Sequence, residues 1–458
     1  MDGPRSRRNF LCLTAGAAAA TVGVACSGSD DRKKAAAERA KKSAAGADRT
    51  LRIVQWSHYV PAYDTWFDNE YTKRWGEEND AEVVVDHIPF AEVAARADAV
   101  VASKRGYDIF GFVDPPPVYE DEVIDHREIV EELEARYGKM TSLVERSVFN
   151  PKTKKYFGAP DYWVANPVHY RVDLWDQVEP GLMPTTWDNL IRAGPKLKAM
   201  GFPLGIGISF DGDSNYSLLS LLHAYGASVQ DEDGRVAINS PATVEAVKTA
   251  ATIYGTGMTE DVFVWEGFSN NRVLTAGQAS LILNAVSAIR AAEAQDPGLA
   301  AKIALAPVPT AGAGAGGPRG IYVTGVNVIW KFSPRQDLAK QFLIDLASQQ
   351  REAFVRSGFY NLPSFPGAIP DLTELVANDS KATPPDKYAL LGEAEQWSTN
   401  IGHPGHANAA VDEVFSQFIV PKMFAAAARG EMSAEDAVKT AETEMKPIFD
   451  KWKERGKI

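Results

Sequence analysis

Cysteine is almost absent from this sequence of 458 residues, which contains only Cys12 and Cys26. Everything after residue 26 therefore lacks a thiol, and this excludes an internal disulfide, a cysteine zinc site and a cysteine nucleophile from the folded part of the chain. Stability must come from a hydrophobic core instead. Roughly 400 residues are ample for such a core, and that length is typical of two domains.

The sequence also lacks a basic excess and a long apolar segment. Its formal net charge is -12, and no stripe of lysine and arginine stands out, which argues against nucleic acid as a partner. No segment after the first 26 residues reaches the length and apolarity of a membrane-spanning helix. The motifs Gly-x-Ser-x-Gly and His-Glu-x-x-His are missing too, so two common kinds of hydrolase have no support.

The N-terminus has the layout of an export signal. Arg7 and Arg8 precede an apolar run from Phe10 to Ala25, and this run is shorter than the about 20 residues that a membrane helix needs. A basic start, an apolar run and small residues at its end are typical of a cleaved signal. The stretch SRRNFL at 6–11 resembles the twin-arginine export motif, so we predict export of the folded chain by that route.

A single cysteine follows this apolar run. The residues VGVAC at 22–26 resemble a lipobox, in which a peptidase cuts before a lipid-modified cysteine, although Gly23 stands where leucine is usual. We therefore predict a lipoprotein signal over 1–25, lipidation of Cys26, and a flexible tether over 26–49. A plain signal with an incidental cysteine is the alternative. A lipid anchor would hold the protein at the cell membrane, in the periplasm or on the outer face.

After the tether, strand-like and helix-like segments alternate. Apolar, β-branched runs at 51–56, 81–88 and 107–113 predict buried strands, and helical spacing of apolar residues at 63–79 and 90–106 predicts the helices between them. Such alternation predicts a parallel sheet with helices on both faces. Because ligands of these sheets bind beyond the carboxyl ends of the strands, we expect the loops after the first and third strands to lie near a site.

The second half repeats this style with other elements. Strands are predicted at 203–209, 279–285 and 321–330, and helices at 185–201, 239–257, 287–294 and 335–358, followed by a mainly helical region from 407 onward. Thr185 or Thr186 is expected to cap the first of these helices, and Asn239 or Ser240 the second. The run AGAGAGGPRG before the last strand predicts a flexible connection.

Several segments of this half resemble one known family. They are VHYRVDLWDQV, MPTTWDNL, INSPATVEAV, GQASLILNA and GVNVIWKFSPRQDLAKQFLIDLAS. In this order and spacing they resemble family 1 of the bacterial extracellular solute-binding proteins, the group that contains the maltodextrin-binding protein. The resemblance extends from about Leu51 to the end of the chain.

The resemblance implies an α/β, two-lobe periplasmic-binding-protein fold, class II-like, with a cleft between the lobes and a hinge of crossing strands. We predict an N-lobe from 50–162 with 316–362 and a C-lobe from 163–315 with 363–458. The crossings are expected near 157–166, in the Gly-rich run before Ile321, and near 359–364. Hinges of this kind absorb a rotation while each lobe stays rigid.

The resemblance also implies a function, which we state as an expectation. The protein would be a monomeric, extracytoplasmic receptor that binds a sugar or oligosaccharide and delivers it to the permease subunits of an ABC importer. It would not be an enzyme and would need neither cofactor nor metal. A non-sugar solute such as a polyol, an amine or a phosphorylated compound is one alternative, and a surface-anchored glycosidase with paired carboxylates is another.

Candidate site residues are aromatic planes and hydrogen-bonding groups on the loops expected at the cleft. Sugars offer apolar C–H faces and hydroxyl groups, so a site for them needs both kinds of side chain. The candidates are Trp56, His58, Tyr59, Phe112, Asp114, Tyr162, Trp163, Asp211, Asp213, Asn215, Trp265, Asn284, Tyr360, Asn361, His403 and His406.

Ordinary structural roles stay open for each candidate. Core packing is the alternative for Trp56, Phe112 and Trp163. A simple turn is the alternative for the run from Asp211 to Asp213. A surface position at a helix start is the alternative for His403 and His406. An anionic ligand is disfavoured by the acidic loops, unless an arginine faces the cleft. The arginines in question are Arg171, Arg272 and Arg290.

Overall fold

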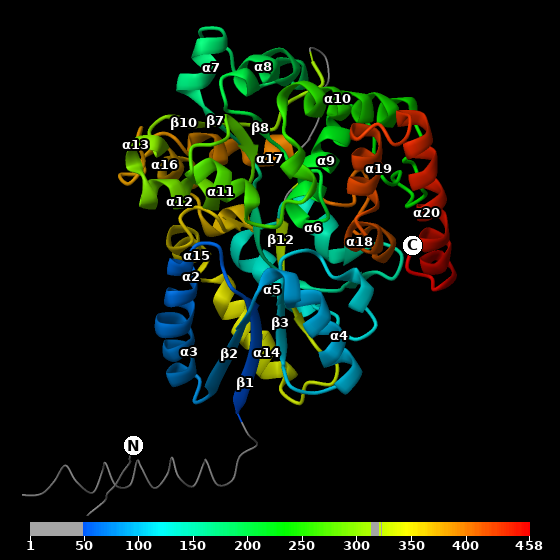
Figure 1. The fold of residues 1–458 in the computed structure, drawn as a ribbon. Helices are drawn as coiled ribbons and strands as arrows, with labels where there is room; N and C mark the ends of the chain where they lie inside the picture. Colours follow the sequence, from blue (N-terminus) through cyan, green and yellow to red (C-terminus); the bar gives the residue numbers. More distant parts are fainter. Residues whose placement is uncertain (1–48, 313–319, 322) are drawn as a thin grey trace, which may run out of the picture. The chain divides into compact units, whose positions relative to one another are not determined.

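The computed structural model describes residues 49–312, 320–321 and 323–458. The predicted signal, Cys26, all but the last residue of the tether and most of the Gly-rich run lie outside the described residues. The chain from Thr50 to Ile458 forms one compact unit. Its helices and strands alternate in an α/β fold with two separate main sheets, as the sequence predicts (Figure 1).

The larger sheet has six strands in the order β13-β6-β12-β3-β1-β2. Their bounds are β1 (Thr50–Trp56), β2 (Glu82–Ile88), β3 (Ile109–Phe112), β6 (Ala159–Val164), β12 (Val323–Ile329) and β13 (Leu362–Pro363). β1 is parallel to β2 and β3, as predicted. β12 runs antiparallel to both β3 and β6. The prediction of a parallel sheet therefore holds only for β1–β3, because later segments of the chain add strands in the opposite direction.

Helices associated with this sheet come from two separate parts of the sequence, 61–148 and 336–356. They are α2 (Pro61–Trp66), a π-helical turn (Phe67–Tyr71), α3 (Thr72–Glu78), α4 (Val93–Ser103), α5 (Arg127–Tyr137), α6 (Ser142–Val148), α14 (Gln336–Ala347) and α15 (Gln350–Arg356). The single helix predicted over 335–358 is wrong, since α14 and α15 are separate. The break places Gln350 in the interior, where its amide Nε2 donates to the Asp161 carbonyl at 2.9 Å.

The smaller sheet has four strands in the order β10-β7-β9-β8. Their bounds are β7 (Val168–Arg171), β8 (Leu204–Gly205), β9 (Leu281–Leu283) and β10 (Ile303–Ala306). The helices next to them in sequence are α7 (Val172–Val178), α8 (Trp187–Ala199), α9 (Gly212–Ala224), α10 (Pro241–Gly257), α11 (Ser269–Thr275), α12 (Ser287–Gln295) and α13 (Pro297–Ala300). The strand predicted over 203–209 is shorter than expected, because the Ile208 amide bonds to the Val262 carbonyl instead of a neighbouring strand.

The last part of the chain is mainly helical, as predicted. It contains α16 (Leu372–Ala377), α17 (Ala394–Trp397), α18 (Ala409–Ser416), α19 (Ile419–Ala428) and α20 (Ala434–Glu454). Two short strand pairs complete the structure, β11 (Gly320–Ile321) with β14 (Ser398–Thr399) and β4 (Phe149–Asn150) with β5 (Lys155–Tyr156). Among the described residues, no helix combines the length and the apolarity that crossing a membrane requires.

Two helix starts confirm predicted caps. The Thr186 side chain accepts a hydrogen bond from the Asn189 amide at the start of α8, and Ser240 accepts one from the Thr243 amide at the start of α10. Such caps satisfy backbone N–H groups that have no partner within the helix. Trp187, which begins α8, is buried in the core. The caps and the core residue together fix where these helices begin.

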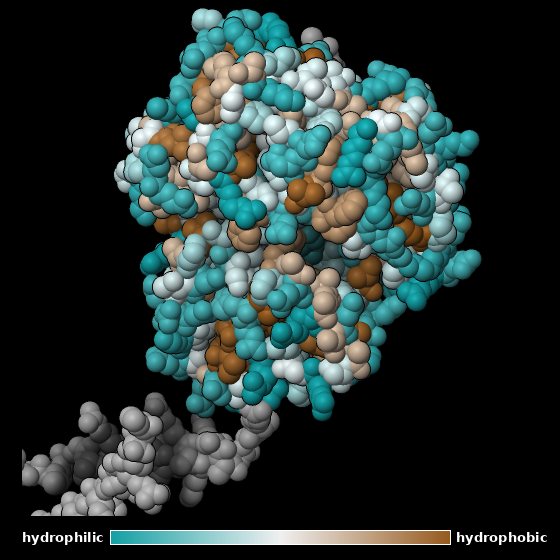
Figure 2. Space-filling model, viewed as in Figure 1, coloured by the Kyte–Doolittle hydropathy of each residue, from teal (hydrophilic) through white to brown (hydrophobic). Residues whose placement is uncertain are grey.

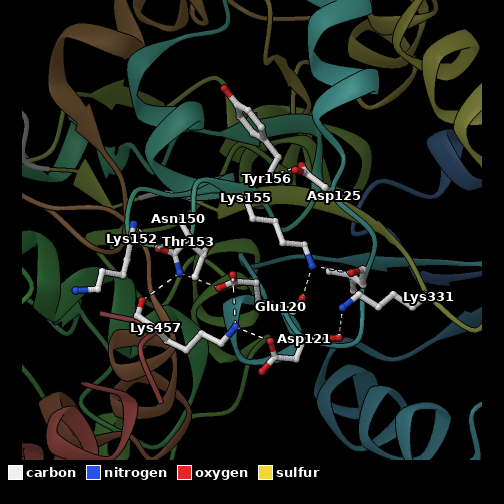
Figure 3. Close-up of polar contacts among 11 residues, drawn as sticks. Glu120, Asp121, Asp125, Asn150, Lys152, Thr153, Lys155, Tyr156, Lys331 and Lys457 are labelled. Carbon is white, nitrogen blue, oxygen red and sulfur yellow. Dashed lines mark hydrogen bonds and ion pairs between the residues drawn. The ribbon is translucent and has the colours of Figure 1, made fainter. Parts of the chain in front are cut away.

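A group of polar side chains ties the end of the chain to the segment after β3. The Lys457 ammonium lies 2.6 Å from the Asp121 carboxylate and 3.5 Å from that of Glu120. Asn150 donates both to the Glu120 carboxylate and to the Lys457 carbonyl. We call Glu120, Asp121, Asn150 and Lys457 the C-terminal clamp (Figure 3). Because Lys457 follows α20, the clamp connects the helical C-terminal region to the end of the six-stranded sheet.

Candidate functional site

A small cavity lies where loops of the two sheets meet. Its volume is about 30 Å³, close to the share of one water molecule in the liquid. Residues after β1 and β3, including Tyr59 and Val113, line one side. Residues on α9 and after β9, including Asp213 and Asn284, line the other. We call this space the deep cavity, and in this conformation it is too small for a sugar ring.

A much larger groove adjoins the deep cavity. Its volume is about 810 Å³, and it lies between the segments around α4 and β3 and the segment around α18. Phe90 and Val113 line both spaces, so the two spaces are adjacent, and we refer to them together as the cleft. The surface drawn in Figure 2 is hollowed near the middle of the face shown, with apolar atoms beside hydrophilic ones. A groove of this volume is in the range of small-molecule sites.

Six of the predicted site residues line this cleft. Tyr59, Asp213, Asn284 and Tyr360 line the deep cavity, and Phe112 and Asp114 line the groove. Tyr59 and Asp114 follow the carboxyl ends of β1 and β3, where parallel strands are expected to place ligand-binding loops. The rule about strand ends therefore predicted that these two residues lie near the same site, although they are far apart in sequence.

Asp114 is held in place by one tyrosine. The Tyr216 hydroxyl donates to the Asp114 carboxylate, with its two oxygens at 2.7 and 2.8 Å. Burial raises the pKa of Asp114 to about 6. Asp412 on α18 lines the same groove, and burial together with the Asp114 charge raises the pKa of Asp412 to about 8. The two carboxylates therefore repel each other when both are ionised.

Asp213 sits in a network of amides at the start of α9. Its carboxylate accepts from the Asn270 amide at 2.8 Å and lies 3.5 Å from the Asn284 amide. Burial, followed by the charge of Asp211, raises the pKa of Asp213 to about 7. Asp211 caps α9, because its carboxylate accepts from the Ser214 amide at 3.0 Å. Asp211 therefore fixes the start of α9, whereas Asp213 lines the cavity.

Four predicted residues form a cluster that supports Tyr59 and Tyr360. They are Trp56, His58, Tyr162 and Asn361, and all four are buried. The Trp56 indole donates to the Tyr162 hydroxyl at 3.0 Å, and the ring centroids of Trp56 and Tyr59 are 5.0 Å apart. The ring centroid of Tyr360 is 4.8 Å from that of His58. These contacts hold the two cavity tyrosines in fixed positions.

The protonation of His58 follows from its contacts. Its Nδ1 accepts from the Val60 amide at 2.9 Å, so the proton of the neutral ring is on Nε2, which lies 3.0 Å from the Asn361 Oδ1. Burial lowers the pKa of His58 to about 4. His58 is therefore a neutral structural donor near pH 7, and its contact with a ligand stays a prediction.

Two predicted aromatic residues line neither cavity. Trp163 is buried in β6, and its indole donates to the Pro363 carbonyl at 2.9 Å. Trp265 packs against Gly205, and its indole donates to the Asp261 carboxylate at 3.0 Å. Both indoles thus have protein partners, which favours the packing alternative. Their ligand contacts stay predictions.

Three polar candidates also lie outside the lining of the cleft. The Asn215 amide donates to the Phe415 carbonyl at 3.0 Å. The His403 Nδ1 lies 2.9 Å from the Thr399 hydroxyl. The carbonyl of His406 accepts from the Gln230 amide at 2.9 Å. These contacts join neighbouring segments, and the ligand roles of the three residues likewise stay predictions.

The sequence analysis missed several lining residues. They are Phe90, Asn166, Tyr216, Asp412 and Phe415. Phe90 follows β2, so the rule about strand ends could have found it. Asn166 lies within the predicted first crossing. Tyr216 lines the deep cavity from α9, and Asp412 and Phe415 line the groove from α18. Only their contacts in space reveal these three residues.

No arginine lines either cavity within the described residues. Arg171 pairs with Asp173, Arg272 bonds the Ser269 hydroxyl, and Arg290 pairs with Glu293 and Asp379. The three arginines that could have favoured an anionic ligand are thus engaged elsewhere. Over the same parts of the chain, no group of three or more His, Cys, Asp and Glu side chains is arranged to hold a metal ion.

Comparison with known proteins assigns the family. Residues 60–350 match the model of the bacterial extracellular solute-binding proteins, and the chain belongs to that family. A curated relative from Deinococcus radiodurans, described as a "Probable ABC transporter-binding protein", is 26% identical over 171 residues, which are 36% of this chain and 40% of the relative. The match thus spans less than half the length of this relative.

Solved structures of the same fold cover most of the chain. The maltose-bound MalE3 of T. maritima has a TM-score of 0.71 at 19% identity and covers 87% of this chain and 99% of its own. A sugar transporter protein from Arthrobacter chlorophenolicus with bound laminaribiose has a TM-score of 0.72 at 17% identity, covering 87% and 99% of the two chains. The predicted family and the two-lobe α/β fold are therefore confirmed.

Proposed function

We propose that the protein is the extracytoplasmic substrate-binding component of an ABC importer and that it binds a sugar or oligosaccharide in the cleft. The observation that carries this proposal is the lining of the deep cavity. Tyr59 and Tyr360 supply aromatic surfaces there, and Asp213 and Asn284 supply hydrogen-bonding groups. Aromatic planes match the C–H faces of a sugar ring, and carboxylate and amide groups match its hydroxyls.

The proposal assigns ligand contacts to the six predicted residues that line the cleft. They are Tyr59, Phe112, Asp114, Asp213, Asn284 and Tyr360. The maltose and the laminaribiose in the two solved structures support a sugar as the class of ligand. The lobe boundaries, the lipid anchor on Cys26, export by the twin-arginine route, the monomeric state and delivery to permease subunits are part of the same proposal.

A thermal-shift screen across mono- and oligosaccharides and polyols tests this function. A bound ligand stabilises the folded state by mass action, by about 2.7 kcal/mol at a concentration of 100 times Kd. We expect at least one carbohydrate to raise the melting temperature, and to be recovered unchanged after incubation with the protein. Failure of every carbohydrate to raise it would contradict a sugar receptor, and cleavage of the bound sugar would indicate a glycosidase.

A further inference from the structure

The groove has a marked excess of negative charge. Asp98, Asp114, Asp412 and Glu413 line it, and Lys451 is its one ammonium group among the described residues. That ammonium is engaged by the Glu413 carboxylate. The groove therefore has carboxylates whose charge no protein cation balances.

Asp114 and Asp412 are two groove carboxylates whose charges repel each other. Asp98 accepts from the Tyr119 hydroxyl at 2.8 Å, and Asp114 likewise has one tyrosine hydroxyl as its partner, that of Tyr216. Asp412 has only the backbone N–H of Val118 as a hydrogen-bonding neighbour within the described structure. Two such carboxylates in a half-buried groove are costly unless they share a proton or a cation lies between them.

The deep cavity supplies a second and independent observation. Asn166 and Tyr360 line it and are 7% and 2% exposed. Over the described residues, neither side chain has a hydrogen-bond partner, and neither is among the fully buried unpaired atoms, so the polar atoms of both are open to the cavity. Since both side chains face the cavity, they point to a ligand that brings hydroxyl groups into the deep end of the cleft.

We propose that the cleft selects a sugar-like solute that carries a protonated amine, with hydroxyl groups in the deep cavity and the ammonium between Asp114 and Asp412. This inference rests on the proposed function and adds the chemical class of the solute. Phe90 and Phe112 also line the groove, and aromatic rings favour a nearby cation. Asp412 would be the residue that distinguishes an amino sugar from a neutral one.

Calorimetry with matched pairs of sugars tests this inference. Each pair is a neutral sugar and its 6-amino-6-deoxy derivative, built on glucose, maltose and laminaribiose. An ammonium group can form charged hydrogen bonds with both Asp114 and Asp412. We therefore expect the amino sugar of at least one matched pair to bind about 10- to 100-fold more tightly than its neutral partner at pH 7.5. Equal or tighter binding of the neutral member in every pair overturns the inference and leaves a sugar receptor intact. Failure of all these sugars and of the wider carbohydrate screen contradicts both.

An Asp412→Asn variant locates the selectivity. We expect its affinity for the amino sugar to fall by about 10-fold or more, and to fall further than its affinity for the neutral partner does. Glu77→Gln, at an exposed position on α3, is the matched control and should bind as the wild type does. Retained preference for the amine in folded Asp412→Asn overturns the role of Asp412.

The pH dependence of the wild type gives a readout that needs no variant. The groups around Asp412 are Asp98, Asp114, Glu413, Lys451, Tyr119 and Tyr216. The carboxylates ionise as the pH rises, so affinity for the amino sugar should increase from pH 5.5 to 8.5, while a primary alkylamine stays largely protonated. Affinity for the neutral sugar should change little. An amino-sugar affinity that is flat or falls over this range contradicts the inference.

Discussion

Trp163 shows how a residue near the expected crossing can serve packing. Its indole is 4% exposed and donates to the Pro363 carbonyl at 2.9 Å. We expect Trp163→Ala to lower the free energy of unfolding by about 3 to 5 kcal/mol, since large-to-small changes in a core leave a cavity. A melting curve and calorimetry with the ligand identified by screening measure both effects. An unchanged melting temperature with a 30- to 150-fold loss of affinity, about 2 to 3 kcal/mol, would restore Trp163 to the site.

Asp412 also controls how stability depends on pH. Its pKa is raised to about 8 in the folded protein by burial and by Asp114, whereas it is near 4 in an unfolded chain. The folded state therefore binds more protons between these values, and this residue makes the protein less stable as the pH rises through that range. We expect Asp412→Asn, which is neutral throughout, to gain stability over the wild type by about 1 kcal/mol or more at pH 8.

The same comparison at acidic pH is the check on this prediction. Near pH 4 the wild-type carboxyl is protonated, so the stabilities of the two proteins should converge. Chemical denaturation at both pH values measures the difference. If the stability gain of Asp412→Asn is equal at pH 4 and pH 8, the difference between the two proteins comes from packing and not from ionisation.

At the scale of the element, the start of α10 shows what a sequence pattern specifies. Asn239 and Ser240 were both candidate caps, and the structure assigns the role to Ser240. We expect Ser240→Ala to cost about 1 kcal/mol of unfolding free energy, because the Thr243 amide loses its acceptor. Asn239→Ala, the matched control, should cost less, since its side chain bonds only the Glu442 carboxylate, at an exposed contact. Equal costs in chemical denaturation would contradict the assignment.

Elements that depend on local pattern were predictable from the sequence. The strands β1–β3, the caps Thr186 and Ser240, and the cleft position of Tyr59 and Asp114 follow from periodicity, from cap chemistry and from the rule about strand ends. The antiparallel direction of β12 depends on pairing with distant strands. For the same reason, no local signal in the sequence indicated that Asp412 and Tyr216 lie near Asp114. Asp114 and Asp412 are several hundred residues apart in the sequence.

At the scale of the whole molecule, the C-terminal clamp holds the C-terminal region against the segment after β3. Glu120 is 2% exposed, and Lys457 is its charged partner. Removing one partner of a buried ion pair leaves an uncompensated charge, so we expect Lys457→Ala to loosen the contact between the C-terminal region and the segment after β3. Small-angle scattering should show a larger radius of gyration for the variant. Lys453→Ala, at an exposed position on α20, is the control, and equal radii for all three proteins would contradict the prediction.

The anchor is the other property of the whole molecule that can be tested directly. Cys26 follows the apolar run of the predicted signal, and each buried methylene of an acyl chain contributes about 0.8 kcal/mol to membrane binding. Cys26→Ser should therefore move the protein from the membrane fraction to the soluble fraction. Cys12→Ser, within the signal, should leave it bound. If Cys26→Ser stays as membrane-bound as the wild type, the lipobox interpretation is wrong.

The small volume of the deep cavity has a consequence for the speed of uptake. A space of about 30 Å³ admits no sugar ring, so a solute can enter only while the cleft is transiently wider. If the wider form is rare, the apparent affinity equals the affinity of that form multiplied by the fraction of molecules in it. The observed association rate in stopped-flow tryptophan fluorescence should then level off at high solute concentration. The plateau would measure how often the cleft opens, and this frequency would set an upper limit on how fast each receptor molecule can be reloaded.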